Sequence, residues 1–178
     1  MTVITAGSEN EAVPLTGRFG GFVDSRGSWS RVFERQLFRR YNLEAYEASI
    51  SFTEEAHTLR GLHSLTPSAE EWKLVTCARG EVWDVAVNVN RNSSLFGSYQ
   101  GFFLSGVTGD WVLIPPGYAH GFISLSGDVI LGNTMSVCYV PDLEVGYRFD
   151  DPFFNIEWPV SPKLVSQKDL SFELVSRP

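Results

Sequence analysis

Hydrophobic and polar residues alternate along much of the chain between positions 43 and 139, a pattern typical of half-buried β-strands. The segments that show it are 43–52, 58–63, 71–78, 81–89, 98–104, 110–114, 121–125 and 129–139. Turn signals rich in glycine and proline separate several of them, as at Gly106–Gly109 and Pro115–Gly117. Many short strands at a spacing of roughly 8–12 residues predict a β-sandwich or a β-barrel.

The clearest alternation lies in residues 81–89, with the sequence Glu-Val-Trp-Asp-Val-Ala-Val-Asn-Val. One face of this predicted strand carries Val82, Asp84, Ala86 and Asn88, and the other carries Trp83, Val85, Val87 and Val89. Asp84 therefore lies on the less hydrophobic face, which in a barrel is either the lumen or the outer surface.

The two ends of the chain are patterned less regularly. We expect an N-terminal arm over residues 1–21, a short helix within 29–38, and a loop or one helical turn at 161–169. Internal repeats, low-complexity tracts and shifts of composition typical of linkers are absent from the sequence. A single domain over residues 1–178 is therefore expected.

Composition supports an all-β fold and narrows the classes of function. Aromatic residues make up 13% of the chain, which also has 16 glycines and nine prolines, as suits short strands joined by turns. The 14 basic and 21 acidic residues give a net charge of −7. This charge argues against binding to nucleic acid or to an anionic membrane surface.

Neither a membrane span nor a secretory signal is expected. Apolar runs fall short of the roughly 18 residues that a spanning helix needs. The N-terminus lacks a basic flank followed by a long apolar stretch. Cys77 and Cys138 are far apart and show neither a disulfide framework nor zinc-ligand spacing. These features predict a soluble, cytoplasmic protein.

One segment carries a recognisable spacing, Gly109-Asp-Trp-Val-Leu-Ile-Pro-Pro-Gly-Tyr-Ala-His120. A glycine is followed by five residues, Pro-x-Gly, two residues and a histidine, which resembles the second motif of cupin barrels. Pro115 and Gly117 suit a tight turn, because proline presets φ and glycine accepts a left-handed conformation. The strand that follows would aim His120 into the mouth of the barrel.

A metal site is the weaker interpretation of the histidines. The usual companion motif of metal cupins, His-x-His with a downstream carboxylate, is missing, because serine and leucine follow His63. The chain has three histidines, His57, His63 and His120, whereas a first-row metal ion wants three or four converging ligands. Two of these histidines with Asp84 could form a facial triad, so a metal-dependent cupin oxygenase or isomerase stays as an alternative.

Ordered segments from about residue 22 to residue 169 carry a more specific pattern. They are Asp24-Ser-Arg-Gly27, Arg60-Gly-Leu-His63, Lys73-Leu-Val75, Gly80-Glu-Val-Trp-Asp-Val-Ala-Val87, Phe96-Gly97, Ile114-Pro-Pro-Gly-Tyr-Ala-His-Gly-Phe122, Asp151-Pro152, Ile156-Glu-Trp-Pro159 and Ser166-Gln-Lys-Asp169. In order and spacing they resemble the dTDP-4-dehydrorhamnose 3,5-epimerases, a family of metal-free cupins. The resemblance implies a cupin jelly-roll β-barrel with an N-terminal arm and a short helical or loop segment at the C-terminus.

For function, the resemblance implies epimerisation of a nucleotide-linked 4-keto-6-deoxyhexose, with dTDP as the expected carrier, at C3, C5 or both. The ketone acidifies the hydrogens on these carbons. A base removes one, an enolate forms, and a proton returns from the opposite face. Such chemistry needs no cofactor and no metal, only a base, an acid and cationic or hydrogen-bonding support for the enolate oxygen.

The resemblance also implies roles for single residues. His63 matches the catalytic base, and imidazole suits proton transfer near neutral pH. Asp169 matches the aspartate that hydrogen-bonds this base and fixes its tautomer. Arg60, with its planar fork of donors, would bind phosphate, and Lys73 would support the enolate oxygen.

Further residues are implied at the sugar and at the nucleotide. His120 would hydrogen-bond the sugar near the keto group, oriented by Asp84. Phe22 and Arg26 of the N-terminal segment would reach the pocket of a neighbouring subunit, with Arg26 at its nucleotide. The expected assembly is a homodimer that exchanges its N-terminal arms.

Some positions depart from the family pattern. Counting back from Arg60, the family's Gln and Asn on the preceding strand fall at Ala48 and Ile50, which cannot hydrogen-bond through their side chains. The tyrosine that serves as general acid falls at Asn133, and an amide cannot deliver a proton as a phenol does. A second family tyrosine is retained as Tyr139, a candidate substitute acid. These departures predict epimerisation of a single centre, with C3 favoured, or of both centres slowly.

Another alternative also stays open, a catalytically weakened cupin that only binds a nucleotide sugar. The retained His63 and Asp169 favour an epimerase over this alternative, because binding alone needs no base.

Overall fold

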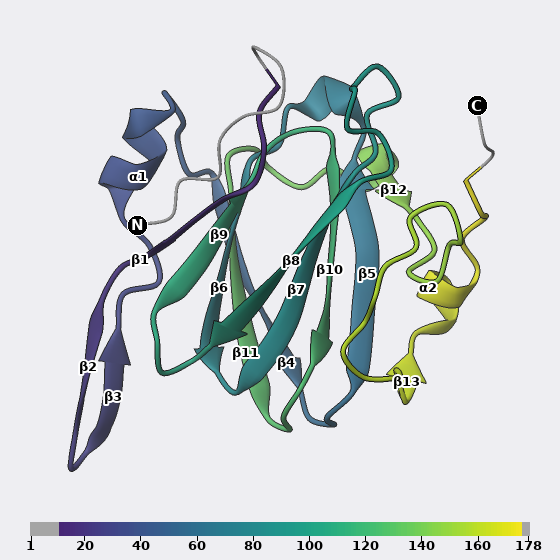
Figure 1. Cartoon of the computed structure of the whole chain (residues 1–178). Coiled ribbons are helices and arrows are strands. Elements are labelled where there is room, and N and C mark those ends of the chain that lie inside the picture. The colour runs from purple at the N-terminus through teal and green to yellow at the C-terminus, as the bar shows by residue number, and fades with distance from the viewer. Residues whose placement is uncertain (1–10, 176–178) are drawn as a thin grey trace.

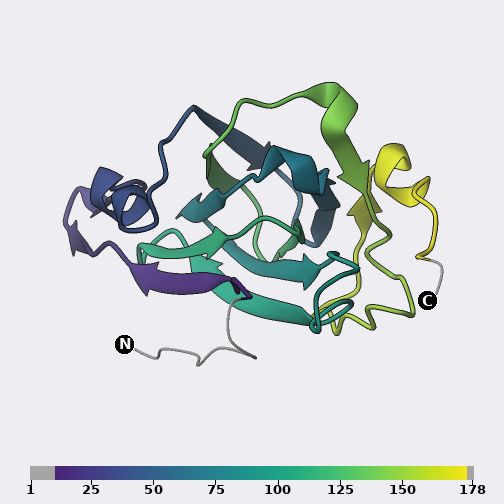
Figure 2. The ribbon, with the colours of Figure 1, turned by 90° about the horizontal axis from the view of Figure 1, so that it is seen from above.

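Two β-sheets pack face to face and form the body of the molecule (Figure 1, Figure 2). The computed structural model describes residues 11–175. The first sheet contains, in spatial order, β1 (Leu15–Arg18), β9 (Asp110–Ile114), β6 (Lys73–Arg79), β11 (Val129–Met135) and β4 (Glu47–Thr53). The second contains β12 (Glu144–Gly146), β5 (Thr58–Leu65), β10 (Tyr118–Ser124), β7 (Glu81–Asn88) and β8 (Tyr99–Ser105), with β13 (Leu164–Val165) pairing parallel to β5. This is the double-sheet arrangement of a jelly roll.

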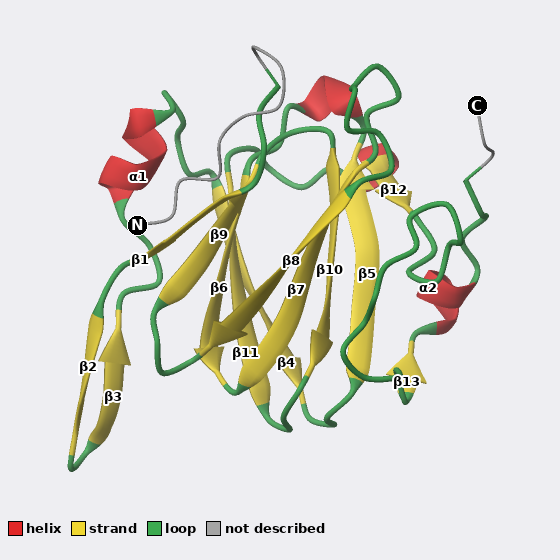
Figure 3. Cartoon of the chain, in the orientation of Figure 1, coloured by secondary structure: helices red, strands yellow, loops and turns green. Residues whose placement is uncertain are grey.

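Helices are few and short, and they lie outside the two sheets (Figure 3). The α-helices are α1 (Arg35–Arg40) and α2 (Gln167–Leu170), and the 3-10 helices are η1 (Pro67–Ala69) and η2 (Pro141–Leu143). A separate hairpin is made by β2 (Gly21–Asp24) and β3 (Gly27–Ser30). The dominance of strands confirms the expected all-β class.

The alternation of residues 81–89 decides which side chains enter the space between the sheets. Val82 and Ala86 of β7 are fully buried and belong to the same core cluster as Val75 and Leu131 of the opposite sheet. Asp84 shares their face and is also fully buried. The sequence left two places for this carboxylate, and the structure places it in the lumen.

Other parts of the chain cover the outer faces of the sheets. Residues after β12 pack on β7 and β10, with Phe154 buried among them. Helix α1 covers β6 and β9 through Leu37 and Phe38, its two buried residues. Each sheet therefore has an apolar covering over part of its outer face as well as an apolar inner face.

The N-terminal segment differs from the expected arm of residues 1–21. Residues 1–10 lie outside the described part of the chain, but Leu15–Arg18 pairs with β9 as β1 and so belongs to the barrel sheet. The hairpin β2–β3 comes next and projects from the barrel (Figure 1). Four-residue strands at an edge are too short to give a clear alternation, which is why the sequence did not separate β1 from the projecting hairpin.

The remaining elements match the predicted strands with small shifts. The helix expected within 29–38 forms at Arg35–Arg40, because residues 27–30 are taken by β3. The strand predicted for 129–139 ends at Met135. The helical turn expected near 161–169 is confirmed as α2, whose N-cap Ser166 accepts a hydrogen bond from the Asp169 backbone N–H. None of the helices in the described part of the chain is long and apolar enough to cross a membrane.

Candidate active site

A cavity of about 580 Å³ opens between the two sheets. One wall comes from β4, β6 and β11, the opposite wall from β5 and β10, and segments after these strands complete the lining. The predicted site residues that line it are Arg60, His63, Lys73, His120, Asn133, Tyr139 and Asp169. Phe22 and Arg26 are the predicted site residues that it lacks.

A local irregularity in β5 brings Arg60 and His63 to the same cavity. Residues three positions apart point to opposite faces of a regular strand. In the pairing of β5 with β10, His120 lies opposite His63 while Phe122 lies opposite Arg60, so two steps on β10 match three on β5. This extra residue is a β-bulge, and it turns both side chains inward.

Gly61 is required at this bulge for two reasons. Its φ of +126° lies in the region that favours glycine, and an added Cβ would lie 2.6 Å from the Cα of Gly121. Its backbone N–H also donates to Oδ2 of Asp169 at 3.1 Å. The Arg-Gly-Leu-His sequence therefore builds a bulge and at the same time a donor for the carboxylate beside the histidine.

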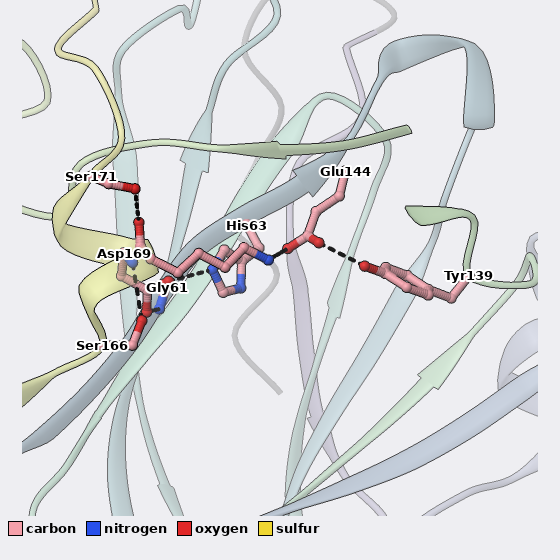
Figure 4. A network of polar contacts seen from close by, with 8 residues as sticks. Gly61, His63, Tyr139, Glu144, Ser166, Asp169 and Ser171 are labelled. Atoms are coloured by element: carbon pink, nitrogen blue, oxygen red, sulfur yellow. Dashed lines mark hydrogen bonds and ion pairs between the residues drawn. The ribbon is translucent and has the colours of Figure 1, made fainter. Parts of the chain in front are cut away.

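His63 and Asp169 form the central pair of the site (Figure 4). Nε2 of His63 lies 2.8 Å from Oδ1 of Asp169, and Asp169 is only 3% exposed. Burial works to raise the pKa of this carboxyl, but hydrogen bonds from His63, the Gly61 N–H and Ser166 outweigh it and lower the pKa. The ionised carboxylate accepts the Nε2–H of the imidazole, which leaves the lone pair on Nδ1 free to take a proton.

A second histidine–carboxylate pair lies deeper between the sheets. Nε2 of His120 lies 2.6 Å from Oδ2 of Asp84, and both residues are buried. The other carboxylate oxygen of Asp84 has no hydrogen-bond partner among the described residues. The expectation that Asp84 orients His120 agrees with this contact.

The two predicted cations hold different positions in the cavity. Arg60 is exposed and donates from Nε to Thr53 Oγ1 and from Nη2 to the Phe52 carbonyl, each at 3.1 Å. Lys73 is mostly buried, and its Nζ lies 3.3 Å from Oε2 of Glu71. Arg60 keeps donors for an anion at the opening, whereas Lys73 brings a charge already balanced by a carboxylate.

The polar side chains of β4 face the cavity, which corrects one alignment made from the sequence. Glu47, Ser49 and Ser51 line the cavity. Ile50, in contrast, is 75% exposed on the other face of the strand. Ala48 and Ile50, the positions reached by counting back from Arg60, therefore do not line the cavity, and the polar residues Glu47 and Ser49 next to them do. The length of the irregular connection between β4 and β5 cannot be counted by alternation.

Asn133 lies on β11 directly opposite Ser49 of β4. Its Oδ1 atom is buried without a hydrogen-bond partner among the described residues, and so is Oγ of the nearby Ser51. Both atoms belong to residues that line the cavity. This wall therefore carries short polar side chains, and an amide stands at position 133, where the family pattern has a phenol.

Tyr139 belongs to a chain of three polar side chains beside His63 (Figure 4). Its phenol donates to Oε2 of Glu144 at 2.6 Å, and Nζ of Lys168 donates to Oε1 of the same carboxylate at 2.7 Å. The hydrogen bond to Glu144, aided by burial and by the negative charge, raises the pKa of Tyr139. The phenol therefore keeps its proton at neutral pH.

Similarity to known proteins shows the family to which this chain belongs. A sequence profile of the dTDP-4-dehydrorhamnose 3,5-epimerases matches residues 16–176, which is most of the chain. The chain belongs to this family. The resemblance seen in the sequence motifs is thereby confirmed.

Individual relatives agree with the profile. The dTDP-4-dehydrorhamnose 3,5-epimerase of Sinorhizobium fredii is 33% identical over 153 residues, which cover 84% of this chain and 78% of the relative. The dTDP-4-dehydrorhamnose 3-epimerase of Streptomyces niveus is 34% identical over 151 residues, covering 82% and 72%. A crystal structure of dTDP-6-deoxy-D-glucose-3,5-epimerase from Legionella pneumophila, in complex with dTDP-4-keto-L-rhamnose, matches with a TM-score of 0.82 at 29% identity, covering 90% and 87%. These likenesses confirm the cupin jelly roll and show that the chain is a carbohydrate epimerase, an isomerase.

The hairpin residues stand apart from the cavity of their own chain in this family member. Arg26 forms an ion pair with Asp24 across the hairpin turn, with 2.6 Å between Nη2 and Oδ2. Phe22 stacks on Trp29 with ring centroids 5.4 Å apart, and the two rings remain about half exposed. A role for Phe22 and Arg26 at a substrate therefore requires the cavity of another subunit.

Several lining residues were missed by the motif analysis of this epimerase. They are Glu47, Ser49, Ser51, Glu71, Glu144 and Lys168. The β4 residues had a signal, because Glu47, Ser49 and Ser51 are polar at every second position. Lys168 had one too, as the neighbour of Asp169 in the Ser-Gln-Lys-Asp segment.

Two of the histidines considered as ligands of a metal triad are hydrogen-bonded to aspartates in the structure. Nε2 of His63 is hydrogen-bonded to Asp169, and Nε2 of His120 to Asp84. Within residues 11–175, no three His, Cys, Asp or Glu side chains gather in a group that could hold a metal ion. His63 and His120 are each oriented by an aspartate of their own.

Proposed function

We propose that this epimerase acts on a dTDP-linked 4-keto-6-deoxyhexose and inverts a carbon next to the ketone, with His63 as the base. The observation that carries the proposal is the contact of 2.8 Å between His63 and the buried Asp169 at the wall of the cavity. A pure binding protein needs no such oriented base. The ligand of the Legionella relative, dTDP-4-keto-L-rhamnose, supports the nucleotide-sugar class.

The proposed reaction begins at Nδ1 of His63. This atom takes the proton from C3 or C5, and the electron pair of the broken C–H bond delocalises onto the ketone oxygen as an enolate. Lys73, whose ammonium has donors beyond its contact with Glu71, hydrogen-bonds that oxygen, and His120 hydrogen-bonds the sugar beside it. Asp169 stabilises the imidazolium that forms.

The proton that completes inversion has to come from the opposite face of the sugar. Asn133 occupies the position of the expected phenol and has no proton of suitable acidity to give. Tyr139, a neutral phenol that also lines the cavity, is the proposed acid. One donor at a new position suits one carbon better than two, because a misplacement of about 1 Å costs roughly 10² in rate.

We therefore propose inversion at one centre, with C3 favoured. C3 carries a hydroxyl group, and the ketone and Lys73 together would assist exchange of the proton on this carbon. The Streptomyces niveus relative is named a 3-epimerase, which supports single-centre action within this family.

The nucleotide end of the site is proposed to need a second subunit. Arg60 is an exposed cation of the cavity lining and has further donors to offer a diphosphate. Arg26 and Phe22 sit on a hairpin that projects from its own barrel (Figure 1). In a homodimer that exchanges this hairpin, both residues would complete the partner's pocket.

The test is incubation of the protein with a dTDP-4-keto-6-deoxyhexose in D₂O, followed by proton NMR. Loss of the C3 or C5 proton signal together with an inverted product supports the proposal. Binding measured by calorimetry without any exchange would instead support the weakened cupin that only binds a nucleotide sugar.

A further inference from the structure

We propose that helix α2 positions both halves of the acid–base pair, with Asp169 orienting the base His63 and its neighbour Lys168 acting through Glu144 to position the acid Tyr139. This inference rests on the proposed function above. It assigns Lys168 and Glu144 as positioning residues of the reaction.

The adjacent residues Lys168 and Asp169 make contacts with different partners (Figure 4). Oδ1 of Asp169 lies 2.8 Å from Nε2 of His63. Nζ of Lys168 lies 2.7 Å from Oε1 of Glu144, and Oε2 of that carboxylate accepts the Tyr139 phenol at 2.6 Å. A single helical turn is therefore in contact with the base directly and with the acid through one carboxylate.

Glu144 accepts hydrogen bonds from the phenol and from Lys168 most strongly while it is ionised. Burial works to raise the pKa of Glu144, but the hydrogen bonds from Lys168 and Tyr139, with the charge of Lys168, lower it. Both carboxylate oxygens are then occupied, one by the ammonium and one by the phenol. Without Lys168, the carboxylate would lose its cation and the contact that fixes its rotamer.

The backbone holds this arrangement in register. Strand β12, which carries Glu144, pairs with β5 so that Gly146 lies opposite His63. Helix α2 is capped by Ser166, and Nη1 of Arg148 donates to the Leu170 carbonyl at 2.6 Å. The base and the two supports thus rest on neighbouring elements, whereas Tyr139 follows β11 of the opposite wall, where its backbone N–H donates to Glu47 of β4.

The proton transfer balances with these groups. The O–H bond of Tyr139 breaks as the electron pair of the enolate forms a new C–H bond, which leaves a phenolate. His63 releases its proton to water, and because Tyr139 is also about half exposed, the phenolate takes a proton back from water, which restores both groups. During that interval the phenolate stands beside the Glu144 carboxylate, and the ammonium of Lys168 offsets the two negative charges.

The experiment compares Lys168→Met, Lys168→Arg and a matched control, Lys163→Met, in D₂O. Lys163 is an exposed lysine in the segment before α2 and does not line the cavity. Two rates are measured at the same carbon: exchange with retention, which needs only His63, and inversion, which also needs the acid. The His63 side chain is 34% exposed, so its proton can exchange with solvent before it returns.

We expect Lys168→Met to slow inversion by about tenfold or more while exchange with retention stays within about twofold of wild type. Lys168→Arg should recover most of the inversion, because arginine keeps the charge and the donors. Lys163→Met should match wild type in both rates. In Glu144→Gln, the alkaline limb of the inversion profile should move to lower pH, because the carboxylate that raises the pKa of Tyr139 is gone.

Two results would overturn the inference. Equal inversion rates in Lys168→Met and Lys163→Met would show that Lys168 positions nothing. A parallel loss of exchange and inversion in Lys168→Met would show that the lysine acts on the fold or on Asp169. A wild-type protein with neither exchange nor inversion would contradict the proposed function itself, which is a separate outcome.

Discussion

His63 and Asp169 are separated by 106 positions in the chain, and yet Nε2 of the imidazole lies 2.8 Å from Oδ1 of the carboxylate. The bulge at Gly61 supplies a second donor to the same carboxylate, so the orientation of the base depends on β5 as well as on α2. Since Asp169 orients the imidazole but does not replace it, we expect loss of His63 to slow the reaction more than loss of Asp169.

His63→Asn is expected to lower deuterium uptake by roughly 10² to 10⁴, since it removes the general base. Asp169→Asn should have the smaller effect, because it disturbs the tautomer and orientation of an imidazole that is still present. His57→Asn is the control, since His57 does not line the cavity. NMR exchange rates and calorimetric binding of dTDP check the prediction, and full exchange in His63→Asn would contradict it.

Restoring a phenol at position 133 is expected to broaden the reaction. Wild type should invert C3 faster than C5, and Asn133→Tyr should raise the rate at C5 more than the rate at C3. Asn133→Phe is the matched control, because it adds the ring without the hydroxyl. Tyr139→Phe should abolish inversion. Equal, rapid incorporation of deuterium at both carbons in wild type would be incompatible with single-centre action.

Gly61→Ala is expected to destabilise the protein more than Gly27→Ala. The two glycines have nearly equal φ values of +126° and +129°, but an added Cβ at Gly27 meets nothing within 4 Å. Both variants carry a backbone strain of about 1–3 kcal/mol. Gly61→Ala adds overpacking against Gly121, which costs about 1–3 kcal/mol more. Urea unfolding of the two variants measures the difference, and equal midpoints would show that the close approach to Gly121 is relaxed without cost.

Mixing a His63 variant with an Arg26 variant tests the proposed exchange of the hairpin between subunits. In a dimer of His63→Asn and Arg26→Ala subunits, the site with an intact His63 would receive an intact Arg26 from its partner. We expect refolded mixtures to regain up to about a quarter of wild-type activity, as random pairing makes half of the dimers mixed, each with one complete site. No recovery in a sample shown to contain mixed dimers would mean that Arg26 acts within its own chain or not at all.

The stability gained from Asp169 is expected to depend on pH. Its pKa is lowered from the ordinary value of 3.8 in the folded protein, so the unfolded chain binds the proton more tightly. The contribution is therefore present above about pH 4 and is lost as pH falls through the lower folded value. The difference in unfolding free energy between wild type and Asp169→Asn should shrink from pH 7 to pH 3. A difference that is constant with pH would assign the effect to packing.

Much of the fold follows from local pattern, and the departures have physical causes. The period of two in residues 81–89 predicts β7, because one face of that strand packs between the sheets and the other beneath the C-terminal segment. The short edge strand β1 has too few residues to show a period. Its pairing with β9 depends on contacts between distant segments.

Some residues of the site can be found from their sequence neighbours, and others only from the contacts that they make in the folded chain. The motifs indicate His63, Asp169 and His120, because their residue types and neighbours are specific. Alternation alone would separate Arg60 from His63, and only the bulge in β5 explains how both face the cavity. Glu144 escapes the motif analysis, since a lone glutamate gains its meaning from Tyr139 and Lys168, which meet it only in the folded chain.

The position of Asp169 on α2 has a consequence for the newly synthesised protein. The strands that carry the base and both cavity walls leave the ribosome well before this helix does. A chain that ends before α2 would carry His63 and both cavity walls, but its imidazole would have no carboxylate to hold the tautomer. Because Asp169 would orient the proposed base and not replace it, we expect such a chain to exchange substrate protons more slowly than the chain that includes α2.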